Sequence, residues 1–395
     1  MATVSIVQQP EVISPVYNTI PFKLQLSTGE EGNNWVSLIY QLEDDSGNII
    51  VPISETSYTA DGSLLDFWRD LASHVKTTFP QLGSPNIFDD ELMVINYKLR
   101  YGVNLYDKTT LLDNPTLDQE SSVKAAYLGA IQFKGGTLFG SLGHLEVLSM
   151  RPTENYTSIY TNDWLWILPS PSLFQVELNV TIFYKSGLTS TVSNVQTPDE
   201  APVCFPIGPA NGFWVGTSSP ASIVRYTVEV IATPTGIGSP APVSIGTYSF
   251  SVSSDCEEDL KQVIWKEPTG GYAGTYFEEA KELLTISSGK IIKTYSPRDA
   301  SPPTDPGRNN SISNFAGQRK VTLRKTLPYS EDAKFFFDGL ITSNDIKVEE
   351  TLLNGDRAVF RLMKDPGGTT HFNSEEYLTI QLTGVIGPDI ISPRR

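Results

Sequence analysis

Short runs in which apolar and polar residues alternate are the feature that most constrains this chain. The clearest run places five apolar residues at every second position: Phe174, Val176, Leu178, Val180 and Ile182. A period of two is typical of a strand that buries one face. The turn chemistry of Lys185-Ser186-Gly187 follows, so we expect the segment Thr189 to Val195 to return antiparallel.

Comparable runs recur along the whole sequence, for example from Val36 to Leu42 and from Tyr377 to Thr383. The 395 residues include 30 Gly and 27 Pro, which favour turns over long helices. The predicted fold class is therefore mainly β, with tandem β-sandwich domains of immunoglobulin- or fibronectin-like type and a few short helices. The Cys-Trp-Cys spacing of a true immunoglobulin domain is absent from the sequence.

Changes in the pattern divide the chain into three expected domains. Residues 1–118 form a β-rich domain with one helix, residues 119–253 form a β-sandwich, and residues 254–395 form a mixed β-rich domain. The segment 296–314 is rich in Pro, Ser, Asp and Asn and is predicted to be a long loop.

Two helices are expected. Apolar residues at spacings of three and four predict one helix that Ser63 caps and Pro80 ends. Ser330 is predicted to cap a second, short helix, with Phe335, Phe336 and Leu340 as its apolar contacts.

The charge and the scarcity of His and Cys restrict the classes of function. A formal net charge of −16 argues against direct nucleic-acid binding and against docking on anionic membranes. Three His and two Cys provide little material for a zinc site or a disulfide scaffold, so no metal or cofactor is expected. Cys204 and Cys256 are predicted to be reduced, buried thiols.

Signals for targeting to a compartment and for catalysis are also weak. The first 13 residues have no basic or apolar region of a secretory signal, and no apolar run is long enough to span a bilayer, so folding in a cytoplasm is expected. Nucleotide-binding and nucleophile motifs are absent, and no residue is assigned a catalytic role. Adjacent acidic residues such as Glu278-Glu279 suggest a glycosidase pair or a calcium site as alternatives to a solvated surface. Asp299 with Asp305 is the best calcium candidate.

Aromatic residues crowd one stretch and form the first candidate interface. Its members are Tyr156, Tyr160, Trp164 and Trp166, which are interpreted as sandwich core, as a protein interface or as a sugar-stacking platform. The second candidate lies in the predicted loop and consists of Pro302, Asp305, Arg308 and Asn310.

Several segments resemble a pattern found in structural proteins of tailed phages and prophages of Bacteroidetes. Arg151-Pro152 is followed by the aromatic strand Trp164-Leu165-Trp166-Ile167-Leu168 and then by the strand and turn Ile182-Phe183-Tyr184-Lys185-Ser186-Gly187. Further on, Cys256, Val263-Ile264-Trp265 and Gly270-Gly271-Tyr272 with Phe277 match in order. Glu267 stands where the pattern usually has Asn, and Ala273-Gly274 stands where Asp or Trp is common.

This resemblance implies a non-enzymatic virion protein, in the tail tip, the baseplate or another part of the tail. The implied partners are other virion proteins, in a homo-oligomer that is a trimer or a hexameric ring, assembled in the bacterial cytoplasm. No catalytic residues come with the resemblance. The alternatives are a receptor- or glycan-binding adhesin that contacts a host surface glycan, and, less favoured, a β-rich glycoside hydrolase.

Overall fold

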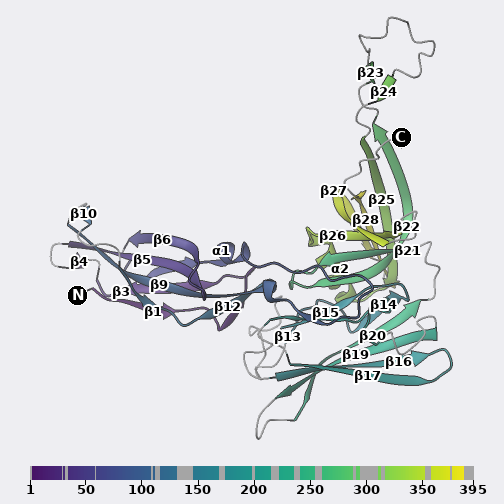
Figure 1. Cartoon of the computed structure of the whole chain (residues 1–395), viewed down its shortest axis with the longest axis horizontal. Helices are drawn as coiled ribbons and strands as arrows, with labels where there is room; N and C mark the ends of the chain where they lie inside the picture. The colour runs from purple at the N-terminus through teal and green to yellow at the C-terminus, as the bar shows by residue number, and fades with distance from the viewer. Residues whose placement is uncertain are drawn as a thin grey trace, which may run out of the picture.

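The chain folds as several β-sheets with two short α-helices among the described residues, as Figure 1 shows. The computed structural model describes residues 2–28, 30–31, 34–57, 59–107, 110–111, 116–130, 146–168, 174–197, 201–214, 222–234, 241–253, 260–287, 291–293, 310–312, 316–351, 357–373 and 376–386. The predicted fold class, mainly β with stacked sheets and few short helices, is confirmed.

The N-terminal part consists of two sheets around one core. A small sheet has the order β1 (Val4–Gln8), β3 (Pro21–Leu26), β7 (Ser63–Asp66). The larger sheet has the order β2 (Ile13–Pro15), β12 (Lys124–Tyr127), β9 (Val94–Asp107), β5 (Asn34–Asp44), β4 (Glu30–Glu31), with β6 (Ile49–Ser57), β10 (Thr110–Leu111) and β11 (Thr116–Glu120) paired beside this path. Phe22 of the small sheet packs edge-on against Tyr97 of the larger one, with 6.4 Å between ring centroids.

The first expected helix is wrong over most of its length. Residues Ser63–Asp66 form strand β7, which pairs with β3, and helix α1 spans only Trp68–Ala72. Leu64 is 65% exposed whereas Leu65 is 8% exposed, which is the alternation of a strand. Pairing with β3 therefore overrides the helical spacing of the apolar residues. A 3-10 helix, η1 (Glu91–Met93), precedes β9.

The second part of the chain is a sandwich of two further sheets. One has the order β13 (Glu146–Val147), β15 (Trp164–Leu168), β18 (Val203–Pro206), β8 (Phe88–Asp89). The other has the order β14 (Glu154–Ser158), β20 (Val243–Ser253), β19 (Ile223–Pro234), β16 (Phe174–Tyr184), β17 (Thr189–Gln196). The predicted antiparallel return of the segment after Gly187 is confirmed by the pairing of β16 with β17.

Strand β15 is buried on both faces. Leu165 and Ile167 belong to the core of the sandwich, whereas Trp164, Trp166 and Leu168 belong to the core of the N-terminal sheets. This double burial explains why the strand is a continuous apolar run without alternation.

The C-terminal part is a closed barrel in the order β21 (Leu260–Lys266), β22 (Tyr272–Ser287), β25 (Ala316–Pro328), β28 (Tyr377–Ile386), β27 (Arg357–Asn373), β26 (Ile346–Thr351). Helix α2 (Glu331–Thr342) contributes Phe336, Phe337 and Leu340 to the barrel core, and Ser330 caps it as predicted by accepting a hydrogen bond of 3.0 Å from the Ala333 N–H. Phe335, the third predicted contact, is 44% exposed.

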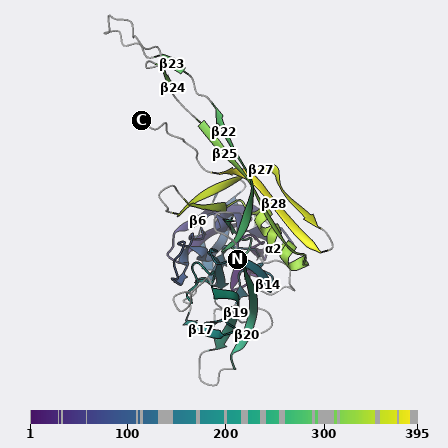
Figure 2. The ribbon, with the colours of Figure 1, turned by 90° about the vertical axis from the view of Figure 1, so that its right-hand side faces the viewer.

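An arm leaves the barrel. Strands β22 and β25 run on together as a hairpin, with the small pair β23 (Ile291–Lys293) and β24 (Asn310–Ile312) at its tip (Figures 1 and 2).

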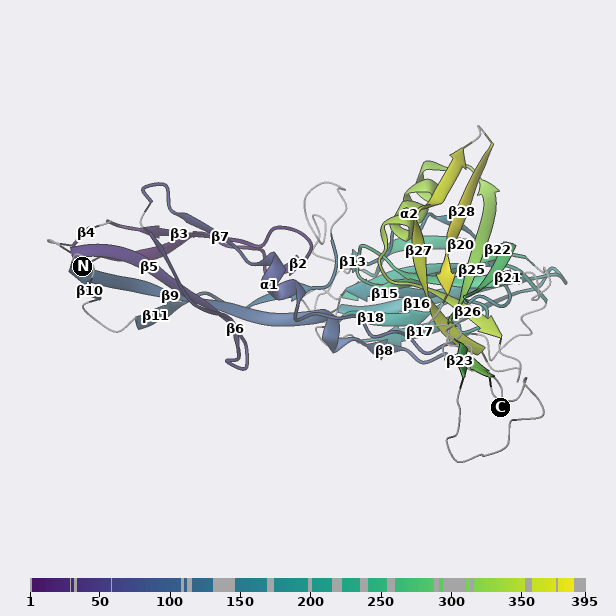
Figure 3. The ribbon, with the colours of Figure 1, turned by 90° about the horizontal axis from the view of Figure 1, so that it is seen from above.

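Two strands cross the divisions expected from the sequence. The segment Lys124–Tyr127, expected in the second domain, pairs with β9 of the N-terminal sheet, and Phe88–Asp89 pairs with β18 of the sandwich. The three-part division otherwise stays a prediction. Figure 3 shows the N-terminal sheets extending away from the sandwich and the barrel. Within the described residues, neither helix reaches the length and apolarity that crossing a bilayer requires.

Candidate functional site: a buried polar joint

Polar and charged side chains meet where the sandwich, the barrel and the N-terminal sheets come together. We call this set the polar joint; its members are Arg151, Asn162, Asp163, Gln262, Glu267 and Lys325. All six side chains belong to residues that are at most 8% exposed. Ionisable residues are rarely buried unless they are paired, so each one requires a partner.

Arg151 and Asp163 form the centre of the polar joint. The two guanidinium nitrogens Nη1 and Nη2 contact the two carboxylate oxygens of Asp163 at 2.6 and 2.7 Å, which is the bidentate geometry that arginine favours. Asp163 Oδ1 also accepts the backbone N–H of Gly274 in β22 at 2.9 Å. The ion pair therefore joins the segment before β14 to the barrel.

The guanidinium of Arg151 is enclosed by aromatic rings from two different parts of the chain. It lies 5.6 Å from the ring centroid of Phe250 in β20 and 5.2 Å from that of Phe336 in α2. Burial alone would lower the pKa of Arg151, but the nearby carboxylates of Asp163 and Glu267 raise it. Arg151 thus stays charged and contacts both the sandwich and the barrel.

Asn162 provides a second connection. Its side-chain Nδ2 donates to Gln262 Oε1 in β21 at 2.9 Å, and its Oδ1 accepts the backbone N–H of Gly83 at 2.7 Å. Gln262 in turn donates to the Asn162 carbonyl oxygen. One amide side chain therefore connects the barrel to the segment that follows α1.

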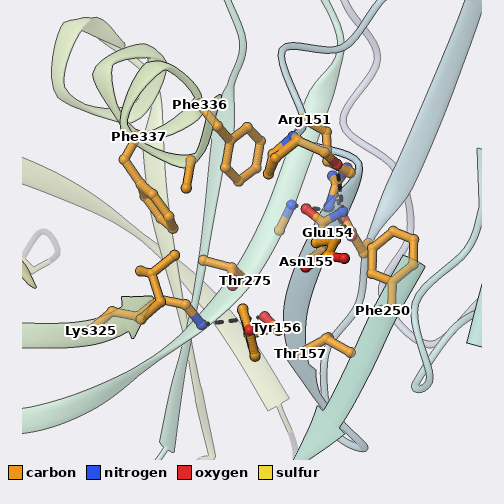
Figure 4. A pocket seen from close by; sticks show the side chains of 15 residues that line it. Arg151, Glu154, Asn155, Tyr156, Thr157, Phe250, Thr275, Lys325, Phe336 and Phe337 are labelled. Carbon is orange, nitrogen blue, oxygen red and sulfur yellow. Dashed lines mark hydrogen bonds and ion pairs between the residues drawn. The ribbon is translucent and has the colours of Figure 1, made fainter. Parts of the chain in front are cut away.

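Lys325 is buried in β25, and its Nζ donates to the carbonyl oxygen of Tyr276 at 3.1 Å. It also donates to the carbonyl oxygen of Tyr156 at 3.4 Å (Figure 4). Burial lowers the pKa of its ammonium group to about 7. Lys325 and Arg151 line a cavity between β14, β22, β25 and α2 with a volume of about 20 Å³. That volume holds about one water molecule and is too small for a sugar ring.

Glu267 is a buried carboxyl group of the polar joint, at 3% exposure. Burial raises its pKa to about 7, although Arg151 and the N–H of Met150, at 3.2 Å from Oε1, favour the ionised form. The folded chain therefore holds a proton that the unfolded chain releases at its ordinary pKa of 4.5. Stability from this group is complete below about pH 4.5 and is lost as the pH rises through about 7.

Glu267→Gln is accordingly expected to flatten this pH dependence. The amide stays neutral at every pH, so the variant should gain up to about 3 kcal/mol over the wild type above pH 7 and nothing at pH 4. Urea unfolding of both proteins at a series of pH values measures the difference. The same change at the exposed Glu120 is the control. A pH-independent difference between Glu267→Gln and the wild type would show that the carboxyl is not neutral in the fold.

The structure separates the residues of the predicted aromatic interface. Trp164 and Trp166 are 2% and 0% exposed, so they are core residues, and both the candidate interface and the sugar-stacking platform are wrong for these two side chains. Their rings contact Phe79 and Phe88, with centroids 6.4 and 5.7 Å apart. Tyr156 is 37% exposed and Tyr160 is partly exposed. A platform built on the two tryptophans is excluded because both are core residues.

The other predicted residues give less information. Pro302, Asp305 and Arg308 lie outside the described residues, as do Asp299 and Cys256, whereas Asn310 begins strand β24. Cys204 is a buried thiol whose pKa burial raises, as expected for a core position. Within the described residues, no group of three or more His, Cys, Asp and Glu residues is placed to hold a metal ion.

The sequence reasoning missed the polar joint. The sequence analysis noted Arg151 only as part of the Arg151-Pro152 motif and Glu267 only as a departure from the phage pattern, and it did not single out Asp163. The contacts span 12 positions for Arg151 with Asp163 and 117 for Met150 with Glu267, so no local pattern could have found them.

Comparisons with known proteins assign no family. No family model matches the sequence, and no curated protein matches it. A solved structure described as the calcium binding domain CBD12 of CALX1.1 has a TM-score of 0.22 at 7% identity, over 64% of this chain and 100% of that one. A tetra-tandem repeat from the extending region of a large adhesion protein has a TM-score of 0.20 at 12% identity, over 91% of this chain and 72% of that one. TM-scores this low carry no argument about function.

Proposed function

We propose that the chain is a non-enzymatic structural protein that acts through protein–protein contacts in a homo-oligomer. The observation that carries this proposal is the polar joint, which connects three sets of sheets through buried side chains. Its charged groups contact one another and backbone groups, as the bidentate pair of Arg151 and Asp163 illustrates. Side chains that are buried and paired in this way fix the shape of the molecule.

The arm supports the same proposal. Strands β22 and β25 continue pairing from Glu278↔Arg324 out to Ser287↔Ala316, so a hairpin projects from the closed barrel (Figure 2). Projecting segments held by a rigid scaffold are well suited to contact neighbouring subunits. Fixed sheets with a projecting hairpin suit a component of a symmetric assembly, because the hairpin can reach a neighbouring subunit while the sheets keep their shape.

The finer part of the proposal is that this assembly is the virion of a tailed phage, at the tail tip, the baseplate or another tail-associated position. It is supported by the resemblance of Arg151-Pro152, the aromatic strand Trp164–Leu168 and Gly270-Gly271-Tyr272 to phage structural proteins. On this account the partners are other virion proteins, and the chain assembles in the host cytoplasm as a trimer or a hexameric ring.

Mass spectrometry of purified particles tests this proposal. Particles from the producing bacterium are separated on a density gradient, and a cytoplasmic host enzyme is followed in the same fractions as the control. We expect the chain to co-sediment with the particles at a constant ratio to the other tail proteins while the host enzyme stays behind. If the chain follows the host enzyme instead, the proposed place in the virion is wrong.

A further inference from the structure

The outer edge of the sandwich is formed by β17, the last strand in the order β14-β20-β19-β16-β17 (Figure 1). Within the described part of the chain, β17 pairs with β16 and with no other strand. The pairing is regular from Thr189↔Phe183 to Gln196↔Val176, without a bulge. Its eight residues, TSTVSNVQ, contain no charge and no proline.

The register identifies which backbone groups face the open side. The Tyr184 N–H donates to the Leu188 carbonyl oxygen at 3.0 Å, so these two residues form a hydrogen-bonded pair. Hydrogen-bonded pairs alternate along an antiparallel ladder, so the N–H and C=O groups that point away from β16 belong to the residues in between. These residues are Thr189, Thr191, Ser193 and Val195.

Several other edges of the described sheets are protected against strand addition. β6 carries Pro52 and Glu55 and has two register shifts in its pairing with β5. β8 and β13 have only two residues each, and the barrel is closed. Natural proteins blunt exposed edges by such means, and β17 has none of them.

We propose that β17 pairs antiparallel with the β17 strand of a second copy of this chain. The two strands are related by a two-fold axis that is perpendicular to the sheet and passes between Val192 of one copy and Val192 of the other. This arrangement places the core-facing sides of both sheets on the same side of the joined sheet. Thr189 then lies opposite the second copy's Val195, and Thr191 lies opposite its Ser193. These are the residues with outward backbone groups, so every ladder hydrogen bond of the new pair can form.

Charge and packing both favour a second copy of this chain as the partner of β17. A chain with a net charge of −16 repels its own copy, and an uncharged edge is where two copies approach at the lowest electrostatic cost. Val192 is half-buried against the sandwich core, and at the two-fold axis it meets its own copy, which extends that core across the interface. This inference rests on the proposed assembly role and makes it more specific. Of the two proposed assemblies it selects the one with six copies, because six copies can form three two-fold pairs whereas a lone trimer cannot.

The test measures the mass of the full chain in solution by sedimentation velocity, without particles. We expect the wild type to form species of even copy number, the smallest at twice the chain mass of 43.5 kDa. Thr191→Pro removes an outward N–H but no hydrogen bond to β16, and should raise the dissociation constant at least about tenfold. Thr191→Val keeps the N–H and the branched shape and should leave the dissociation constant unchanged.

Two cysteine variants that differ in their ability to cross-link keep the test decisive if Thr191→Pro fails to fold. Residues at the two-fold axis have Cβ atoms about 5 Å apart, close enough for a disulfide, whereas residues two positions away do not meet their own copy. Val192→Cys should therefore give a covalent dimer under mild oxidation, and Asn194→Cys, like the wild type, should not. A monomeric wild type, or equal cross-linking of both cysteine variants, overturns the inference. Either result leaves the particle experiment untouched, so the two proposals fail separately.

Discussion

Asp163→Ala is expected to lower the free energy of unfolding by about 3–5 kcal/mol, because it leaves the buried guanidinium of Arg151 without its counter-ion. The change also removes the acceptor of the Gly274 N–H, which belongs to the barrel. Urea unfolding followed by tryptophan fluorescence measures this loss, since Trp164 lies next to Asp163 in the core.

The control is an ion pair of the same kind on the surface. Lys98 and Glu120 are 3.0 Å apart, with side chains 25% and 59% exposed. Glu120→Ala should cost no more than about 1 kcal/mol, since exposed pairs contribute little. A loss for Asp163→Ala as small as that for Glu120→Ala would contradict the view that the polar joint holds the sheets together. Replacing both Arg151 and Asp163 by apolar residues should recover part of the loss.

Gly270→Ala is the second change with a large expected effect. Gly270 has φ +110°, and a Cβ atom there would collide with the backbone carbonyl of Leu128 in the N-terminal core. Its own carbonyl oxygen accepts a hydrogen bond of 2.7 Å from Thr77 Oγ1. Backbone strain and forced separation of these segments together should cost about 2–5 kcal/mol, measured by the same urea unfolding.

Gly187→Ala separates the two causes. Gly187 has φ +83°, but nothing lies within 4 Å of a Cβ atom placed there. This turn variant should therefore lose only the strain of a left-handed alanine, about 1–2 kcal/mol. If the two variants lose the same amount, the close approach between the barrel loop and the N-terminal sheet does not contribute to stability.

The strands were predictable where one face is buried, and helical spacing misled where sheet pairing competes with it. The alternation from Phe174 to Ile182 predicted β16 because burial on one face imposes a period of two. The residues Leu64, Trp68 and Leu71 have helical spacing, yet Ser63–Asp66 pairs with β3, and that long-range contact leaves no local trace.

The candidate site was less predictable than the fold. The sequence marked Trp164 and Trp166 as notable. It could not show that the two faces of β15 are buried in two different cores. The partners of the polar joint lie far apart in the sequence, 117 positions for Met150 and Glu267 and 169 for Tyr156 and Lys325, and meet only because the sheets stack. Closure of the barrel likewise depends on β21 pairing with both β22 and β26, which no short pattern determines.

A cryo-electron microscopy reconstruction of the purified particle tests the central claim most directly, because it gives both the location and the copy number of the chain. We predict that the described sheets fit as one rigid body into symmetric tail density, with the β22–β25 arm against a neighbouring protein. A particle whose tail density is fully accounted for by other proteins would contradict the claim that this chain is a structural component of it.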